Sequence, residues 1–385
     1  MLFIPHKHLY ISGASYISAD EPDYKEVITD ANSRRRMGRL LKMAVWCGLK
    51  SLDGVPSERV AGIITSTGAG FMKDTISFGS SIFDREETLL NPSPFMQSTF
   101  NTASGYIALI RKIHAYNTTY VQQADGFAAS LVDAAMLLDD AGEGNVALVG
   151  AFDEVTPEVD VIRQRLGLYS VGDGFLPLGE GAAAFLLSAA MPTDVSESCP
   201  ATEMSAGFGG DDGSESDSGQ IGDEAGSESA SEWGGDEAGS ESVSERGSDA
   251  NSECSSEPLR ESESASRPCD ESGSESSSEP LHESGETSSR SLNGTKDGNS
   301  ALRFCGLANL SDLPKCAENP IAELFGINAG VNVISCADHV ESLGAFRSLL
   351  PVLLCKLISE QKIPDGYTAI MDNVNADSVI ILLHK

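Results

Sequence analysis

The run YVQQADGF at residues 120–127 has the composition of a strand that turns sharply into a helix. Such an elbow presents one side chain at its tip, with backbone N–H groups and the helix N-terminus aimed at whatever binds there. Acyl transfer would need a Cys, Ser or Thr nucleophile at this point. Residues 122–125 include none of these, and a glutamine carboxamide can form hydrogen bonds but cannot form an acyl thioester. The elbow therefore offers a binding position without a nucleophile.

Other residues with chemical potential give weaker patterns. The run STGAG at residues 66–70 lacks the Lys-Ser/Thr of a phosphate-binding loop and the spacing of a dinucleotide fingerprint, so it predicts a plain strand-to-helix turn. The eight cysteines form no CxxC pair and no zinc-finger spacing. Neither a metal nor a cofactor is expected. Cys336 lies close to His339 in the sequence, but this pair has no elbow around it.

Charge is concentrated in one part of the chain. The formal net charge is −32, of which residues 191–300 carry −22, so the remainder is only mildly acidic at −10. Nucleic acid is not an expected partner, because the only basic cluster is the triplet at residues 34–36. We interpret this triplet as solvating or capping the start of a helix, with binding of an anionic carrier protein as the alternative. No secretory leader and no membrane span is apparent, which favours the cytoplasm.

Alternating short apolar strands and helices predict a layered α/β fold with a mainly buried sheet. Extended segments are expected at residues 8–12, 61–65, 117–122, 145–150, 176–188, 330–335, 366–371 and 377–383. Helices are expected at residues 35–52, 97–112, 127–138, 320–325 and 339–361. The two prolines at residues 90–95 predict a rigid loop.

The composition changes completely within residues 191–300, where Ser, Glu, Gly and Asp dominate and short repeats occur, such as GDEAGSES at 222–229 and 235–242. Such a segment buries too little apolar surface to offset its ordering entropy, which predicts a disordered acidic insertion. We interpret it as a solvating insertion, with a docking or calcium-attracting tether as the alternative. The predicted organisation is an N-terminal half at 1–190, the insertion at 191–300 and an abbreviated C-terminal half at 301–385.

Four motifs occur in the order typical of one family. They are NPSPFMQSTFN at 91–101, the elbow at 119–126 with its helix, ALVGAFDE at 147–154, and GDGFLPLGEGAAAFLL at 172–187. This order resembles the β-ketoacyl synthases of the thiolase superfamily, well over residues 8–190 and loosely over 302–385. The short chain is similar to the ketosynthase-like proteins of bacterial aryl-polyene and flexirubin pigment clusters, including chain length factors. The resemblance implies a thiolase-like α-β-α-β-α fold with an abbreviated second half.

The resemblance also implies where catalytic residues would lie. Family members use an elbow cysteine that accepts the acyl chain and two histidines that assist decarboxylation and stabilise the enolate oxygen. The cysteine position falls on Gln123 or Ala124, depending on whether the glycine or the helix is matched. The first histidine motif is not found before residues 327–330. His339 lies near the place of the second histidine, although a single histidine at a helix start is more often structural.

A glutamine at the elbow is what chain length factors display, so the resemblance implies a catalytically silent subunit of fatty-acid or polyketide-type biosynthesis. It would pair with an active ketosynthase, or with itself, shape the acyl pocket and meet an acyl carrier protein. Residues 117–122 would add to the partner's sheet, and Phe127 would limit the depth of the tunnel. The residues implied to bind or border the acyl chain are Gln123, Gly126, Phe127, Phe95, Met96 and Phe100. For each apolar residue alone, ordinary core packing is the alternative.

Two other interpretations stay open. The chain could be an acyltransferase or decarboxylase that works without an elbow thiol, with Gln123 holding the thioester carbonyl or with Cys336 beside His339 as nucleophile. It could also be a non-catalytic scaffold whose acidic insertion recruits partners.

Overall fold

The computed structural model describes residues 2–18, 20–122, 125–189, 301–375 and 379–385. The described residues on both sides of the long gap belong to the same compact unit. Two predictions, the disordered insertion at 191–300 and the elbow position at Gln123 or Ala124, lie outside the described residues.

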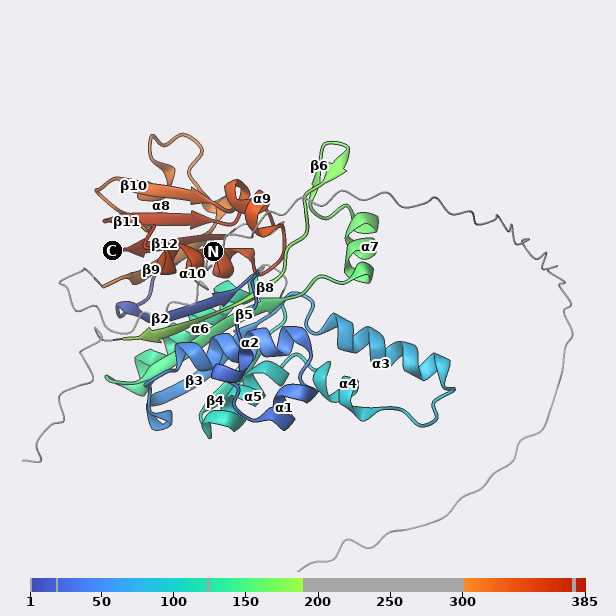
Figure 1. Cartoon of the computed structure of the whole chain (residues 1–385). Coiled ribbons are helices and arrows are strands. Elements are labelled where there is room, and N and C mark those ends of the chain that lie inside the picture. The colour runs from blue at the N-terminus through green and yellow to red at the C-terminus, as the bar shows by residue number, and fades with distance from the viewer. Residues whose placement is uncertain (1, 19, 123–124, 190–300, 376–378) are drawn as a thin grey trace, which may run out of the picture. The chain divides into compact units, whose positions relative to one another are not determined.

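One mixed sheet organises the described chain (Figure 1). Its strands are β1 (Leu2–Phe3), β2 (Leu9–Ile17), β3 (Val60–Ser66), β4 (Tyr116–Tyr120), β5 (Val146–Asp153), β8 (Gly181–Ser188), β9 (Arg303–Asn309), β10 (Val331–Ser335), β11 (Tyr367–Met371) and β12 (Val379–His384). Their order is β10-β11-β12-β9-β2-β8-β5-β3-β4, and β1 pairs with β9. A separate small hairpin consists of β6 (Ser170–Val171) and β7 (Gly174–Phe175).

The sheet consists of two halves with the same strand order. From the central β2–β9 pair outward, the first half runs β2, β8, β5, β3 and β4, and the second runs β9, β12, β11 and β10. The pairing directions also agree, because β8 and β12 are antiparallel to both neighbours while β3–β5 and β10–β11 are parallel. Within the described ranges no strand corresponds to β4 beyond β10. In the part of the chain that the structure describes, the second half is therefore shorter than the first by one edge strand.

Helices cover both faces of each half. The helices of the described chain are α1 (Ala31–Arg36), α2 (Arg39–Ser51), α3 (Met72–Asp84), α4 (Pro92–Gln97), α5 (Thr102–Arg111), α6 (Asp125–Ala141), α7 (Pro157–Leu166), α8 (Pro320–Phe325), α9 (Val340–Leu343) and α10 (Leu349–Ser359). Short 3-10 turns occupy Tyr24–Glu26, Ser57–Arg59, Leu310–Asp312 and Cys336–His339. Helices α2 and α5 pack on the outer face of the first half, α8 packs on the outer face of the second, and α6 and α10 share the core between the halves. This arrangement confirms the predicted α-β-α-β-α layers.

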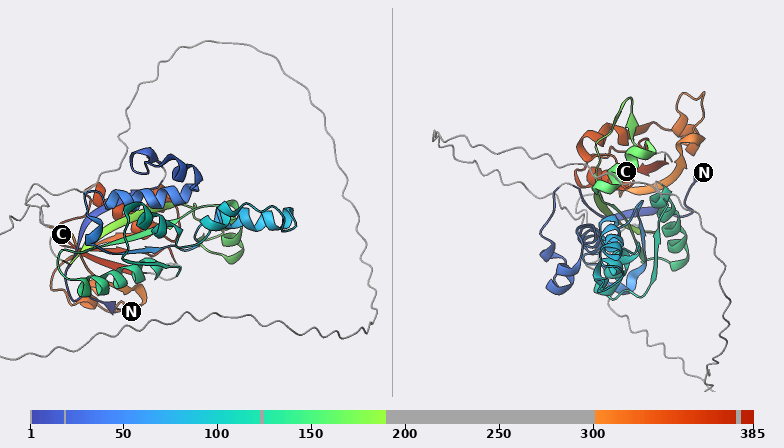
Figure 2. Two further views of the ribbon diagram at one scale, coloured as in Figure 1. Left: turned by 90° about the horizontal axis from the view of Figure 1, so that it is seen from below. Right: turned by 90° about the vertical axis from the view of Figure 1, so that its right-hand side faces the viewer.

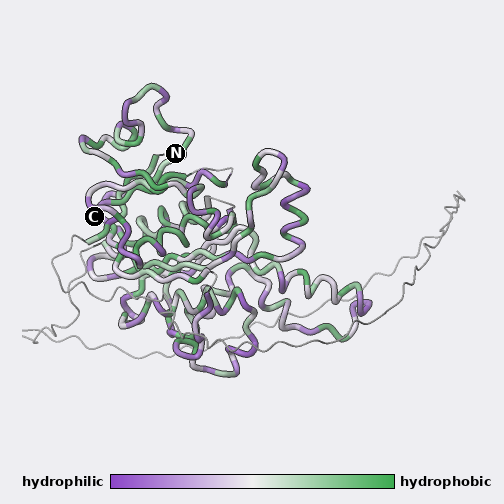
Figure 3. The backbone as a smooth tube through the Cα atoms, turned by 45° about the horizontal axis from the view of Figure 1, so that its top comes forward, coloured by the Kyte–Doolittle hydropathy of each residue, from purple (hydrophilic) through white to green (hydrophobic). Residues whose placement is uncertain are grey.

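The alternation of side chains along each strand separates these layers. In β8, Ala183, Phe185 and Leu187 belong to the middle core, whereas Ala182, Ala184 and Leu186 face α2. In β12, Ile381 faces the middle core and Ile380 faces α8. Apolar segments accordingly run through the strands and the helices between them (Figure 3). Both faces of these strands are buried, which explains their nearly continuous apolar sequences.

Several predicted boundaries were wrong. The loop expected at residues 90–95 is partly helical, because Asn91 caps α4 and Pro92 occupies its first position, where a missing N–H costs nothing. The helix expected from residue 97 begins only at Thr102. The helix expected at 35–52 is interrupted at Gly38, which caps α2, so the arginine triplet forms the last turn of α1 rather than the start of a helix.

The single helix expected at residues 339–361 is also wrong. It is divided at Gly344, whose φ of +77° only glycine adopts readily. The backbone there runs against the first half, where Ala345 N–H donates to Pro177 C=O at 2.7 Å and Gly179 N–H donates to Ala345 C=O at 3.2 Å. A Cβ on Gly179 would lie 1.9 Å from Leu343 C=O, so both glycines are needed for this close approach.

Candidate functional site

The elbow lies where β4 ends and α6 begins. Gly126 N–H donates to Gln122 C=O at 2.7 Å, which closes the turn. Gly126 is buried against the end of β3, because a Cβ on it would lie 3.3 Å from Ser66 Cβ. The neighbouring loop, residues 66–70, is tied to the elbow strand by a hydrogen bond from Thr67 N–H to Tyr120 C=O at 3.0 Å. The elbow and this loop therefore form one unit.

The buried carboxylate of Asp153 holds the loop at residues 66–70 through hydrogen bonds. Asp153, the last residue of β5, accepts hydrogen bonds from Thr67 Oγ1 at 3.0 Å and from the backbone N–H groups of Gly68 at 2.8 Å and Ala69 at 3.2 Å. Its second oxygen accepts from Ser348 Oγ at 2.5 Å. Burial raises the pKa of Asp153, and the hydrogen bonds oppose this shift. Because Ser348 directly precedes α10, this carboxylate joins the two halves.

A second buried carboxylate occupies the equivalent position of the other half. Asp372 directly follows β11 and accepts from the N–H groups of Val374 and Asn375, both at 3.2 Å, and from Asn375 Nδ2 at 2.7 Å. Asn375 in turn accepts from the Tyr169 hydroxyl at 2.8 Å, which lies in the first half. Burial raises the pKa of Asp372, and burial raises the pKa of Tyr169 to about 12. Each half thus reaches the other through a carboxylate at the end of its β5 or β11 strand.

Sequence analysis did not identify Asp153, Asp372 or Ser348 as site residues. Asp153 was part of the quoted ALVGAFDE motif, and an acidic residue that ends a fully buried strand is a signal that could have been used. Ser348 carries no comparable signal, because its partner is 195 residues away.

The predicted pocket residues lie in different environments. Phe127 is buried in the middle core, with its ring 5.5 Å from that of Phe185. Phe95 and Met96 are exposed on α4, and the Phe95 ring packs 5.1 Å from Phe78 of α3. Phe100 is exposed as well and lies over the loop, because a Cβ on Gly70 would meet its ring at 2.4 Å. Their roles toward an acyl chain stay predictions.

His339 is partly buried in the 3-10 turn Cys336–His339 of the second half. Cys336 in the same turn is fully buried, and burial raises the pKa of its thiol well above the usual value. Burial also raises the pKa of Cys47 and Cys355. A thiol with a raised pKa is a poor nucleophile near neutral pH. This disfavours the alternative in which Cys336 acts beside His339.

An open groove of about 620 Å³ lies beside the outer edge of β4. Its lining consists of Ser98, Thr99, Phe100, Asn101, Asn117, Thr118, Thr119 and Val121. None of these side chains is charged. Strand β4 pairs only with β3 within the described part of the chain, so its other edge is unpaired there, next to this groove.

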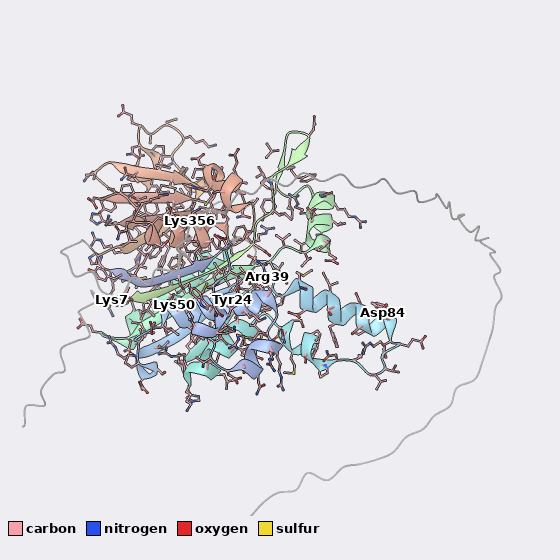
Figure 4. The ribbon with its side chains drawn as sticks, in the orientation of Figure 1. Lys7, Tyr24, Arg39, Lys50, Asp84 and Lys356 are labelled. Carbon is pink, nitrogen blue, oxygen red and sulfur yellow. The ribbon has the colours of Figure 1, made fainter. Side chains whose placement is uncertain are left out.

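An apolar arm lies near the same part of the molecule. Helix α3 has no buried residue and extends away from the sheet, with Asp84 at its outer end (Figure 2, Figure 4). Phe83 in its last turn and Leu89, which follows the helix, are 84% and 91% exposed.

The described residues contain no group of three or more His, Cys, Asp or Glu side chains that could hold a metal ion. None of the described helices is long and apolar enough to cross a membrane.

Comparison with known proteins assigns part of the chain to a family. Residues 14–168 match the family model described as the N-terminal domain of β-ketoacyl synthase. No curated protein matches the sequence.

Three solved structures are similar to all or part of the chain. The ishigamide ketosynthase/chain length factor is similar over 98% of this chain and 99% of that chain, with 12% identity and a TM-score of 0.54, a likeness of fold. The ketosynthase ApeO in complex with its chain length factor ApeC from Xenorhabdus doucetiae has 15% identity and a TM-score of 0.36, over 47% of this chain and 79% of that chain. A β-ketoacyl synthase from Burkholderia phymatum STM815 has 14% identity and a TM-score of 0.39, over 47% and 59%.

Proposed function

We propose that the chain, whose residues 14–168 match the N-terminal domain of β-ketoacyl synthase, acts as a chain-length-factor-type subunit. It pairs through β4 with an active ketosynthase and contributes part of the wall of that partner's acyl pocket. The acyl chain is of the fatty-acid or polyketide type, such as an aryl polyene, and is delivered by an acyl carrier protein. The observation that carries this proposal is the open, uncharged edge of β4 beside the groove.

The edge of β4 has the features of a strand-addition site. An unpaired strand edge accepts a partner strand through main-chain hydrogen bonds, and neighbouring pockets for side chains add specificity. No residue of β4 is charged, and none is a proline. The exposed aromatic residues Phe95 and Phe100 lie on the adjoining segment, where a partner would cover them. The same surface therefore supplies both an edge and apolar contact area.

The elbow sequence supports a silent role. Residues 122–125 contain no Cys, Ser or Thr. Of the described cysteines, Cys47, Cys336 and Cys355 are fully buried, with raised thiol pKa values. Cys305 is half-buried and Cys316 is exposed, and neither lies at the elbow. We infer that the partner is the subunit that carries the acyl thioester.

The test is co-expression with a ketosynthase from the same genome that has an elbow cysteine. We expect a stable heterodimer by size exclusion with light scattering. Intact-protein mass spectrometry after incubation with acyl and malonyl carrier proteins should show an acyl adduct on the partner and none on this chain. An adduct on this chain would favour an acyltransferase instead. If this chain formed only a homodimer and did not bind the ketosynthase, the proposed pairing of the two proteins would be contradicted.

A further inference from the structure

The loop at residues 66–70 is the point where three parts of the molecule meet. Its Thr67 N–H is bonded to the elbow strand at Tyr120 C=O. The Phe100 ring of the groove lies over Gly70. The stem of Arg347, from the second half, lies over Gly68, since a Cβ on Gly68 would be 2.4 Å from Arg347 Cγ. A movement of this loop would therefore displace residues of the elbow strand and of the groove.

We propose that Asp153 is a positioning residue that fixes this loop, and with it the elbow, relative to the start of α10. One carboxylate oxygen accepts three hydrogen bonds from Thr67, Gly68 and Ala69, and the other accepts the hydroxyl of Ser348. We call these five residues the Asp153 clamp. Its importance for the shape of an acyl pocket rests on the proposed function; its importance for the loop does not.

The chemistry of the clamp explains why a carboxylate is used. Only an ionised acid offers enough lone pairs to accept four hydrogen bonds on two oxygens with no donor of its own. Hydrogen bonds to a charged acceptor are about twice as strong as neutral ones. Thr67 extends the clamp by a further step, because its Oγ1 also accepts Gly70 N–H at 2.9 Å. The turn at residues 66–70 is thereby held, directly or through Thr67, by the buried Asp153 carboxylate.

The clamp is a link between halves because of Ser348 alone. The other three donors belong to the loop that follows β3, in the same half as Asp153. Ser348→Ala therefore cuts the connection to α10 and leaves the loop's own bonds in place. Ser359→Ala is a matched control, since Ser359 lies at the other end of α10 and its hydroxyl donates to Lys356 C=O within the helix. Ser348→Thr keeps the hydroxyl and serves as the rescue.

The first measurement is amide hydrogen exchange of the full chain. We expect Ser348→Ala to raise the exchange rate of the Thr67, Gly68 and Ala69 amides by about tenfold, the effect of weakening one hydrogen bond to a charged group. Ser359→Ala should change these rates by less than about twofold, and Ser348→Thr should restore them. Unchanged protection of the loop in Ser348→Ala would overturn the proposal. A uniform rise over the whole chain would do so too, because it would mean general destabilisation.

The second measurement separates the clamp from the proposed function. In the heterodimer, Ser348→Ala should shift the ratio of longer to shorter products while the affinity for the ketosynthase stays within about twofold. If no heterodimer forms, the proposed function fails, and hydrogen exchange still decides the clamp. If the loop loosens but the products of an active heterodimer are unchanged, the clamp does not position the pocket and that part of the proposal is overturned.

Discussion

The two halves of the sheet use the same strand order but end differently. In the first half, β4 lies outside β3 and presents an uncharged edge next to a groove. In the second half, the described sheet stops at β10, the counterpart of β3. The described second half thus has the four inner strands and their helices without a counterpart of β4. Shortening at an edge is therefore compatible with the fold, because the buried layers are formed by the inner strands.

The equivalent carboxylates show the same contrast. Asp153 in the first half holds a loop that belongs to another strand and reaches across to Ser348. Asp372 in the second half mainly holds the turn that directly follows it. Asp153 of the first half thus positions the loop that is bonded to the elbow strand, whereas Asp372 of the second half stabilises a local turn. If the first half is the one that shapes the site, changes there should affect function more than equivalent changes in the second half.

The largest expected effect concerns the core that both halves share. Leu353 of α10 is fully buried in it, so Leu353→Ala should lower the free energy of unfolding by about 2–5 kcal/mol through lost burial and a residual cavity. Met136 of α6 is 62% exposed, so Met136→Ala should change the free energy of unfolding by less than about 0.5 kcal/mol. Urea unfolding followed by circular dichroism measures both. Similar values for the two variants would contradict the burial of Leu353 in this core.

The second prediction concerns the backbone contact between the halves. Gly344 has a φ of +77° and lies against the backbone of Gly179, so Gly344→Ala should cost about 3 kcal/mol or more from strain and steric overlap. Gly326 has a φ of +66° in open space, and Gly326→Ala should cost about 1 kcal/mol. Thermal unfolding of the two variants gives the comparison. Equal costs would mean that the close approach at Gly344 contributes nothing.

The third prediction compares the two sheet edges. Val121, next to β4, and Val333, in β10, are similarly exposed, at 40% and 52%. Val121→Lys places a charge beside the groove and should weaken the ketosynthase complex by about tenfold, equivalent to about 1.4 kcal/mol. Val333→Lys should weaken it by less than about twofold. Titration calorimetry measures the affinity of each variant for the ketosynthase. A larger loss of affinity for Val333→Lys than for Val121→Lys would place the interface at the β10 edge instead.

The smallest expected effect is a pH dependence from Asp372. Its pKa in the folded chain is raised by burial, so the native state binds more protons than the unfolded state as the pH rises from about 4. The stability contributed by this group is fully present below its unfolded pKa and is lost as the pH rises through the folded value. The free energy of unfolding of Asp372→Asn should lack this loss. Urea unfolding of the unchanged chain and of Asp372→Asn between pH 4 and 7 measures this. If the pKa of Asp372 were unshifted, the free energies of unfolding of the two proteins would depend on pH in the same way.

Much of the fold could be predicted from the sequence, because it depends on local pattern. Apolar runs bounded by turn residues located β3, β5 and α8 closely, and the change of composition marked residues 191–300. The absence of a nucleophile at the elbow is also a property of the sequence alone. Helix boundaries were less predictable where a cap competed with the apolar pattern, as at Asn91 and Gly38.

Tertiary structure decided what the pattern could not. The apolar residues on both sides of Gly344 favour one long helix, and only the approach of Gly179 from the other half divides it. The pairing of Asp153 with Ser348 likewise joins residues 195 positions apart, and no local signal specifies such a contact. Sequence determined the elements and the missing thiol because both follow from neighbouring residues. The open edge exists only after β3, β4 and β5 have paired within the first half, and the clamp exists only after long-range packing has placed the two halves against each other.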